Sequence, residues 1–417
     1  MKEAIRESSE GEAQAAKGEL TSTKPLEILS GVRIAAFTQF LMGPAAVQYL
    51  ADLGADVTKV EVPAGAWERN FSGAETYPNG WSLFYLMTHR NQRAITLNLK
   101  TPSGLEAAER LVAKADVLIE NFRPGVMDRL GLGYVRAREI NPRIVYASAS
   151  GYGSDNPHRY LPGQDLLVQA MTGLMASTGT SADPPVPTGA PVVDQHGATL
   201  LALGVMAALY HRDRTGEAQR VEVTMVQAAL DLQLEPVVYW LNGGKLRRPD
   251  EALGSTFHPA PYGVYRTKDG YMVISIVPMK AVAEALGNPP TLQPFLDPSV
   301  AFEQRNDIYR ALAPLLAAKS TAEYISILRD AGVWCAPVLD YESAFDEPVI
   351  QHVDAILEID HPLAGKLRVL KNPIRFSAGE ASVNRMPPAL GQQTDEILSE
   401  LGYSQEQIDE LRASGVL

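Results

Sequence analysis

Strand-like and helix-like segments alternate over residues 29–153, and this alternation constrains the fold more than any other feature. The apolar run at 32–37 is typical of a buried strand. Pro44 follows it at a place where a first helical turn tolerates a fixed φ and a missing N–H. A second strand is expected at 55–61, after a helix that ends at Gly54. This order predicts an α/β fold with a doubly wound parallel sheet.

The same pattern continues further along the chain, with a helix expected at 102–115 and strands at 116–120 and 143–149. Loops follow the carboxyl ends of the strands at 38–44, 62–65, 121–125 and 150–153. Ligands of open parallel sheets bind at that edge. We therefore expect the functional site among these loops.

A second, smaller domain is expected between about residues 242 and 336. Pro and Gly there separate short strands at 264–266 and 271–277, and helical stretches follow at 281–286 and 301–329. This mixture indicates an α+β domain. A chain of 417 residues is also longer than one core usually supports.

Composition narrows the possible partners. The net charge is -12 and no basic block occurs, so we expect no nucleic-acid partner. The only cysteine, Cys335, suits a reducing compartment, and the apolar run at 199–210 is too short to span a membrane. Residues 1–26 mix both charges without an apolar segment, which predicts a mobile tail rather than a signal peptide. We expect a cytoplasmic protein without a membrane partner.

Two common chemistries are disfavoured. The segment 38–44 holds one glycine, Gly43, so the G-x-G-x-x-G cradle of dinucleotide-binding proteins is absent. The seven histidines are scattered and no cysteine cluster exists, so no metal site is expected. His196 lies close to Asp194 in sequence, but neighbours in sequence often point apart.

Two groups of charged residues remain open to more than one interpretation. Arg123 and Arg129 flank an expected helix start; they are either surface residues or phosphate ligands, because a planar guanidinium matches phosphate oxygens. Asp194 precedes the small and apolar run at 198–210 and is well placed as an N-cap. A helix N-terminus also favours an ionised carboxylate, which attack on an acyl carbon requires.

Several segments occur in the order found in the class III CoA-transferases, the formyl-CoA transferase and carnitine CoA-transferase family. The chain resembles this family over nearly all of residues 27–417. The matching segments are 29–34, 43–44, 53–61, 91–100, 120–125, 141–143, 191–200, 214–216 and 387–398.

The resemblance implies a Rossmann-like large domain and a smaller α+β domain in an interlocked homodimer. After the tail at 1–26, we expect the first part of the large domain at 27–225. The linker and small domain are expected at 226–340, and the chain returns to the large domain at 341–417.

The resemblance also implies site residues and a reaction. Asp194 corresponds to the nucleophile and Asp165 to a second acid of the site, although Asp165 also suits a helix cap. The CoA-binding positions carried over are Leu97, Asn121, Phe122, Arg123 and Arg129. CoA would move from an acyl-CoA to a carboxylic acid acceptor through an aspartyl anhydride and an aspartyl-CoA thioester. CoA enters with the substrate, so no separate cofactor and no metal is expected.

The chain departs from the formyl-CoA transferases at three places. Leu41 and Val62 replace a glutamine and an arginine, and residues 254–259 contain no Gly-rich run. These differences argue against specificity for formate and oxalate.

Two other functions remain as alternatives. The 2-methylacyl-CoA racemases of the same family pair the aspartate with a histidine that moves protons. Gln164 occupies that position here, and an amide does not shuttle protons, so racemisation is disfavoured. A non-catalytic CoA-binding protein is the third interpretation.

Overall fold

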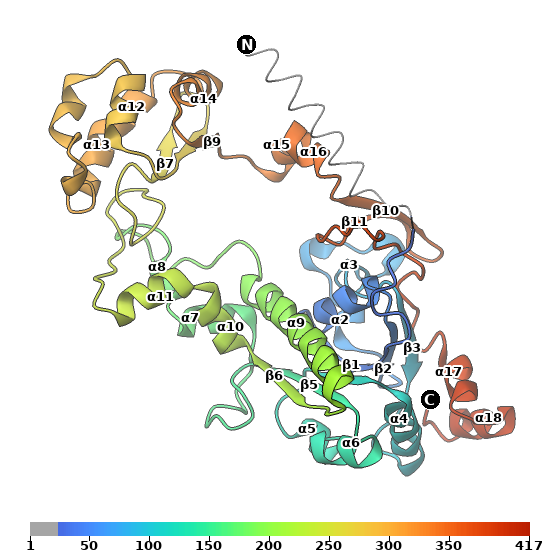
Figure 1. The fold of residues 1–417 in the computed structure, drawn as a ribbon. Coiled ribbons are helices and arrows are strands. Elements are labelled where there is room, and N and C mark those ends of the chain that lie inside the picture. The colour runs from blue at the N-terminus through green and yellow to red at the C-terminus, as the bar shows by residue number, and fades with distance from the viewer. Residues whose placement is uncertain (1–23) are drawn as a thin grey trace. The chain divides into compact units, whose positions relative to one another are not determined.

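The computed structural model describes residues 24–417, and most of the tail expected at 1–26 lies outside this range. The described chain forms two compact units. Unit 1 contains the described residues up to Asp165, Val192–Ala228 and Asp354–Leu417, and unit 2 contains Leu166–Pro191 and Ala229–Val353. The chain therefore leaves unit 1 twice (Figure 1), and residues 166–191 group with unit 2, although the sequence-based boundaries place them in the large domain.

Unit 1 is built on a six-stranded parallel sheet with the order β3-β2-β1-β4-β5-β6. Its strands are β1 (Arg33–Phe37), β2 (Asp56–Glu61), β3 (Gln92–Thr96), β4 (Val117–Glu120), β5 (Val145–Ser150) and β6 (Arg220–Thr224). This is the strand order of a doubly wound nucleotide-binding sheet, and it confirms the expected α/β class. The order reverses between β1 and β4, where such sheets bind ligands.

Helices and a hairpin complete unit 1. The helices are α2 (Met42–Asp52), η1 (Trp67–Arg69), η2 (Gly73–Glu75), η3 (Pro78–Gly80), α3 (Leu83–Leu86), α4 (Pro102–Lys114), α5 (Val126–Arg129), α6 (Tyr134–Ile140), α9 (Val192–Thr215), α17 (Thr394–Glu400) and α18 (Gln405–Ala413). The antiparallel hairpin of β10 (Ile356–His361) and β11 (Gly365–Leu370) was not anticipated from the sequence. Helix α10 (Met225–Leu232) crosses from unit 1 into unit 2.

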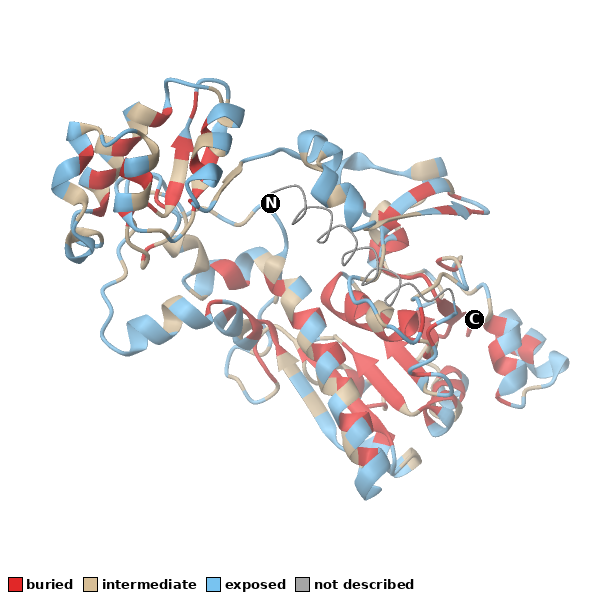
Figure 2. Cartoon of the chain, turned by 45° about the horizontal axis from the view of Figure 1, so that its top comes forward, coloured by how far each residue is buried: buried red, intermediate tan, exposed pale blue. Residues whose placement is uncertain are grey.

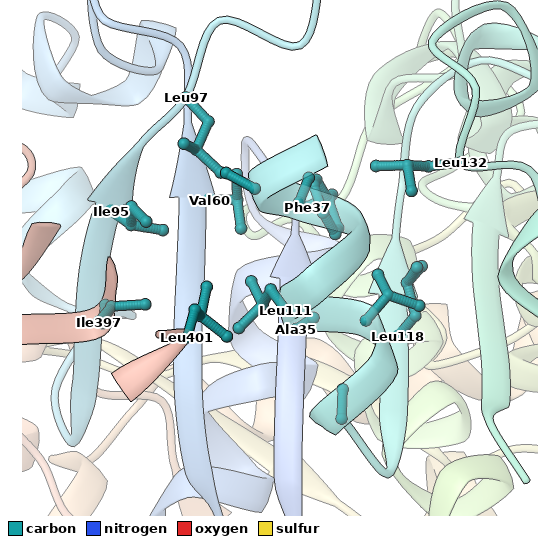
Figure 3. Packing of buried hydrophobic residues seen from close by; sticks show 14 of the residues in the cluster. Ala35, Phe37, Val60, Ile95, Leu97, Leu111, Leu118, Leu132, Ile397 and Leu401 are labelled. Atoms are coloured by element: carbon teal, nitrogen blue, oxygen red, sulfur yellow. The ribbon is translucent and has the colours of Figure 1, made fainter. Parts of the chain in front are cut away.

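Strands β1 to β5 are buried along most of their length (Figure 2), as expected for a parallel sheet covered on both faces, whereas the edge strand β6 is mostly exposed or half-buried. One core cluster joins the strands to α4 and to the C-terminal helices. In Figure 3, Phe37, Val60 and Leu97 lie in this cluster with Ile397 and Leu401 from the end of the chain. The last helices therefore pack on the first sheet, which explains why apolar residues recur so late in the sequence.

Unit 2 contains a smaller sheet and its own core. The sheet is antiparallel, with β8 (Tyr271–Ile274) between β7 (Gly263–Arg266) and β9 (Cys335–Pro337). Its helices are α7 (Asp165–Met171, beginning at the last residue of unit 1), α8 (Leu174–Ser177), α11 (Leu234–Leu241), α12 (Met279–Ala285), η4 (Pro290–Phe295), η5 (Pro298–Val300), α13 (Arg305–Leu316), α14 (Thr321–Asp330), α15 (Tyr341–Asp346) and α16 (Pro348–His352). The helical stretch expected at 301–329 is divided because Ser320 starts a new helix in a capping box with Glu323.

Helix α9 is longer than the apolar run that marked it in the sequence. It spans 24 residues and, among the described residues, it alone has the length and apolar composition needed to cross a membrane. The helix packs on α2, β5 and β6 of unit 1, and side chains such as Leu201 and Val205 are fully buried there. Core helices of soluble domains share these features, so the finding does not indicate a membrane span.

Candidate active site

Two loops at the carboxyl edge of the sheet are joined where the strand order reverses. Asn121, which follows β4, binds both backbone polar groups of Gln39, which follows β1. The Gln39 N–H donates to Asn121 Oδ1 at 2.8 Å, and Asn121 Nδ2 donates to the Gln39 carbonyl at 2.8 Å. A Cβ at residue 43 would lie 2.8 Å from Asn121 Cγ, so the start of α2 requires Gly43. Asn121 therefore fixes the β1–α2 loop.

A buried ion pair also holds the β1–α2 loop in place. Lys59 and Glu68 are fully buried and lie 3.1 Å apart. Lys59 Nζ donates to the Thr38 carbonyl at 2.9 Å, and Glu68 Oε2 accepts from the Phe40 N–H at 3.3 Å. Phe40 has a φ of 61°, an unfavourable value for an aromatic residue. Such backbone strain persists where surrounding bonds determine the conformation, as they do here.

Asp194 lies within α9 and not before it. The helix begins at Val192, so the expectation that Asp194 is the N-cap is wrong, and its carboxylate projects from the first turn. Gly197, one turn later, would place a Cβ 2.7 Å from Met42 Cε, so a larger residue here would displace the end of the Met42 side chain. Gln195 Nε2 also donates to the Tyr49 hydroxyl of α2 at 2.6 Å. These contacts hold the first turn of α9 on α2.

Asp165 caps α9 from a different segment of the chain. Its Oδ2 accepts the N–H groups of Val193 at 2.8 Å and Asp194 at 3.0 Å. A Cβ at Gly151 would lie 2.7 Å from the Gly163 Cα, so two glycines allow the loop after β5 to fold back and deliver Asp165. The structure thus brings together Asp165 and Asp194, the two acids expected from the sequence.

The protonation of Asp194 differs from the sequence-based expectation of an ionised carboxylate. Burial raises the pKa of Asp194 to about 7, and the negative charge of Asp165 acts in the same direction. The helix N-terminus was expected to favour the ionised form. The first-turn N–H groups of Val193 and Asp194 instead bond to Asp165, so they do not stabilise the Asp194 carboxylate directly. Near neutral pH, both forms of Asp194 are populated.

A cavity of about 450 Å³ lies along β4, β5 and β6, from Arg220 at the amino end of β6 to Glu120 and Ser150 at the carboxyl ends of β4 and β5. Three of the five expected CoA-binding residues, Phe122, Arg123 and Arg129, line it. Leu97 and Asn121 do not: the Leu97 side chain is fully buried in the core, and Asn121 is bonded to Gln39. A CoA contact for these two residues stays a prediction.

The cavity also contains residues that the sequence did not indicate. Arg159 and Tyr160 come from the loop after β5, and Arg220 lies on β6. None of them belongs to a recognisable motif, and only the fold brings them to Arg123. Among residues 24–417, no group of three His, Cys, Asp or Glu side chains is arranged to hold a metal ion.

Comparison with known proteins agrees with these observations. CoA-transferase family III matches residues 29–394. Succinyl-CoA:glutarate CoA-transferase from Mus musculus is 33% identical, with 95% of this chain and 91% of the mouse protein covered. Formyl-CoA:oxalate CoA-transferase from Streptomyces coelicolor is 30% identical, with 93% of this chain and 99% of that protein covered.

Comparison with solved structures points to the same family. The crystal structure of a CAIB/BAIF family protein from Brucella suis superposes with a TM-score of 0.76 at 28% identity, covering 91% of this chain and 100% of that one. The match to the family extends over both units, from β1 to the start of α17. The chain therefore belongs to CoA-transferase family III and is a CoA-transferase.

Proposed function

We propose that this enzyme moves CoA from an acyl-CoA thioester to a carboxylic acid through covalent intermediates on Asp194. The observation that carries the proposal is the placement of Asp194 on the first turn of α9, which Asp165 caps and α2 supports. A pKa of about 7 leaves part of the Asp194 population ionised at neutral pH. Ionisation is the condition for nucleophilic attack.

The reaction balances without an added proton or cofactor. An Asp194 oxygen bonds to the thioester carbonyl carbon, and the C–S bond breaks to give a mixed anhydride and CoA thiolate. The thiolate then attacks the Asp194 carbonyl, which releases the donor acid and leaves an aspartyl-CoA thioester. The acceptor carboxylate attacks this thioester, and its C–S bond breaks to give a second anhydride and CoA thiolate. Thiolate attack on the acceptor carbonyl finally yields the new acyl-CoA and free Asp194.

Asp165 has a supporting role in this proposal. Its Oδ2 already accepts two backbone N–H groups, so it orients the first turn of α9. Its charge also keeps Asp194 more basic than an ordinary carboxylate. A more basic carboxylate is the better nucleophile once it is ionised.

Substitution of Asp194 tests the proposal. Asp194→Ala and Asp194→Asn should lower the rate of CoA exchange by at least about a thousandfold, because the covalent route is lost. The assay would follow new acyl-CoA by mass spectrometry with a panel of donors and acids that includes succinyl-CoA and glutarate. Asp213→Asn, at the exposed other end of α9, is the matched control and should keep full activity.

A trapping experiment separates the covalent route from other reactions. Hydroxylamine added with the donor acyl-CoA should convert Asp194 to a hydroxamate, which peptide mass spectrometry locates. Full exchange by folded Asp194→Ala would contradict the proposal. Rapid deuterium incorporation at the α-carbon of a 2-methylacyl-CoA in D₂O would instead support racemisation, which the amide of Gln164 disfavours.

We also propose that the enzyme is a homodimer. Large apolar side chains of α11 are exposed, including Leu234 at 64%, Trp240 at 65% and Leu241 at 66%. Apolar patches of this kind mark interaction surfaces. The resemblance to the family implies that a second copy of this chain covers these side chains.

A further inference from the structure

A second cavity of unit 1 lies at the amino edge of the parallel sheet. Its volume is about 350 Å³, which is within the usual size of a site for a small molecule. Residues near the amino ends of β1, β2 and β3 line it, together with the last residues of α4 and α17. Strand β1 places Arg33, at this edge, roughly 15 Å from the β1–α2 loop at the carboxyl edge. The cavity is therefore separate from the candidate active site.

The charged side chains of this cavity carry a small positive excess. Three are cationic and two are acidic: Arg33, Arg93 and Lys114 against Asp56 and Glu400. Arg93 is buried and holds both acids, with Nη2 at 2.9 Å from Asp56 Oδ2 and Nη1 at 2.8 Å from Glu400 Oε1. The acids are thus fixed on Arg93, and the charges of Arg33 and Lys114 remain for a ligand.

Several donors of these cations are unused. The Arg33 backbone N–H donates to Asp116 Oδ2 at 2.9 Å, but within residues 24–417 its guanidinium has no hydrogen-bond or ion-pair partner. Lys114 Nζ donates to the Glu400 carbonyl, and an ammonium group has two further protons to donate. Among the described residues, the buried Nε of Arg93 also has no hydrogen-bond partner. Unpaired buried donors are rare in folded proteins, so this edge of the sheet suits a ligand that accepts hydrogen bonds.

The rest of the cavity is apolar. Its aliphatic side chains come from β1, from α4 and the residue after it, and from α17 and the residue after it, and each is less than a tenth exposed: Ile34, Leu111, Ala115, Ile397 and Leu401. Figure 3 shows Leu111 beside Leu401. Inorganic phosphate would leave this apolar wall uncovered. A second negative charge on a ligand would face Asp56 or Glu400. The lining therefore matches one negative charge attached to a short apolar chain.

We propose that this cavity binds a small aliphatic monocarboxylate, with its carboxylate on Arg33 and Lys114 and its chain against Leu111 and Leu401. A planar guanidinium binds the two oxygens of a carboxylate in pairs, and the aliphatic chain gains by leaving water. The inference goes beyond the proposed function and does not depend on it, because the site is at the other edge of the sheet from the β1–α2 loop.

Butyrate is the probe, and the methyl groups of Ile34 and Ile397 report its place of binding. Both residues line the cavity, so in methyl NMR of the full-length enzyme their signals should shift together and saturate as butyrate is added. An acid bound at Asp194 would leave them unmoved. From acetate to butyrate, affinity should rise roughly two- to fourfold for each methylene that the cavity buries. Succinate and inorganic phosphate should bind at least about tenfold more weakly than butyrate.

Arg33→Gln and Lys114→Gln should each weaken butyrate binding roughly tenfold, because each removes one charged donor to the carboxylate. Arg143→Gln is the matched control. Arg143 is also exposed at the amino edge of the sheet, two residues before β5, and its backbone N–H likewise donates to a side-chain oxygen, Asn141 Oδ1 at 3.0 Å. It does not line the cavity, so this variant should bind butyrate as the wild type does.

Three results would overturn the inference. The first is that the Ile34 and Ile397 signals of the wild-type enzyme do not move at tens of millimolar butyrate. The second is that Arg33→Gln and Lys114→Gln, shown by circular dichroism to be folded, bind butyrate as tightly as the wild type. The third is that inorganic phosphate binds as tightly as butyrate, which would show that the apolar wall takes no part in recognition. None of these results bears on CoA transfer at Asp194, which the substitution of that residue tests separately.

Discussion

The two carboxyl groups of Asp165 and Asp194 have different environments although they lie side by side. Asp165 is bonded to two backbone N–H groups, whereas Asp194 is half-buried and faces the charge of Asp165. A group whose pKa rises on burial takes up a proton at a higher pH than an ordinary carboxyl. Protonation removes the proposed nucleophile, so the activity of this enzyme should depend on pH close to neutrality.

We expect kcat/KM to rise with pH and to level off above an apparent pKa of about 7. Asp165→Asn keeps an oxygen acceptor for the two N–H groups but removes the charge. The raised pKa of Asp194 should then fall, and the profile should move to lower pH. Rates measured from pH 5 to 9 check this.

Asp213→Asn again provides a control, since it removes a carboxylate about 28 Å away along the same helix. Its pH profile should match the wild type. A profile of Asp165→Asn that does not move would show that Asp165 does not act on Asp194 through charge.

At the scale of elements, the site depends on how closely α2, α9 and the loop after β4 approach one another. Gly197 allows α9 to contact Met42, and Gly43 makes room for the Asn121 side chain. Asn121 and the Lys59–Glu68 pair then hold three successive residues of the β1–α2 loop by backbone hydrogen bonds. The loop is thus formed before substrate binds.

Gly43→Ala tests whether the start of α2 must lie this close to the side chains of Asn121 and Thr38. The new Cβ would lie 2.8 Å from Asn121 Cγ and 2.9 Å from Thr38 Cβ, so these groups must move. We expect a loss of roughly 1–3 kcal/mol in the free energy of unfolding, measured by chemical denaturation.

Gly73→Ala is the comparison variant, because a Cβ added at this residue would have no other atom within 4 Å. It should unfold as the wild type does. Equal stability of the two variants would mean that the β1–α2 loop adapts without cost.

At the scale of the whole molecule, unit 2 exposes large apolar side chains that lie together on one helix. Leu234, Trp240 and Leu241 on α11 are each more than 60% exposed. Burial of apolar area is the main favourable contribution to association. The proposed homodimer accounts for this exposure.

Trp240→Ser with Leu241→Ser should shift the enzyme towards a monomer in light scattering after gel filtration. Trp334→Ser serves as the control, because Trp334 is 69% exposed in unit 2 but lies outside α11. A wild-type monomer across the micromolar range would reject the dimer, and a dimer that persists in the double variant would exclude α11 as its interface.

Much of unit 1 could be predicted because its strands carry local signals. The runs that became β1 and β4 are apolar for most of their length, and β2 follows a helix that ends at Gly54; the structure confirms all three strands within one or two residues. Strand β6 was missed because Arg220 and Glu222 alternate with apolar residues at a sheet edge, and this pattern is short. The family follows from the sequence as well, and the match over residues 29–394 confirms it.

The sequence by itself determined the α/β class. It also predicted the carboxyl edge of the sheet as the place of the site, and Asp194 and Asp165 as its acids; both remain predictions. Tertiary structure decided which residue caps α9, because Asp165 reaches the helix across 28 residues of chain. It also decided the raised pKa of Asp194, since burial is not encoded in any local pattern. The meeting of Arg159 and Arg220 with Arg123 likewise depends on the order of the strands, which only the assembled sheet fixes.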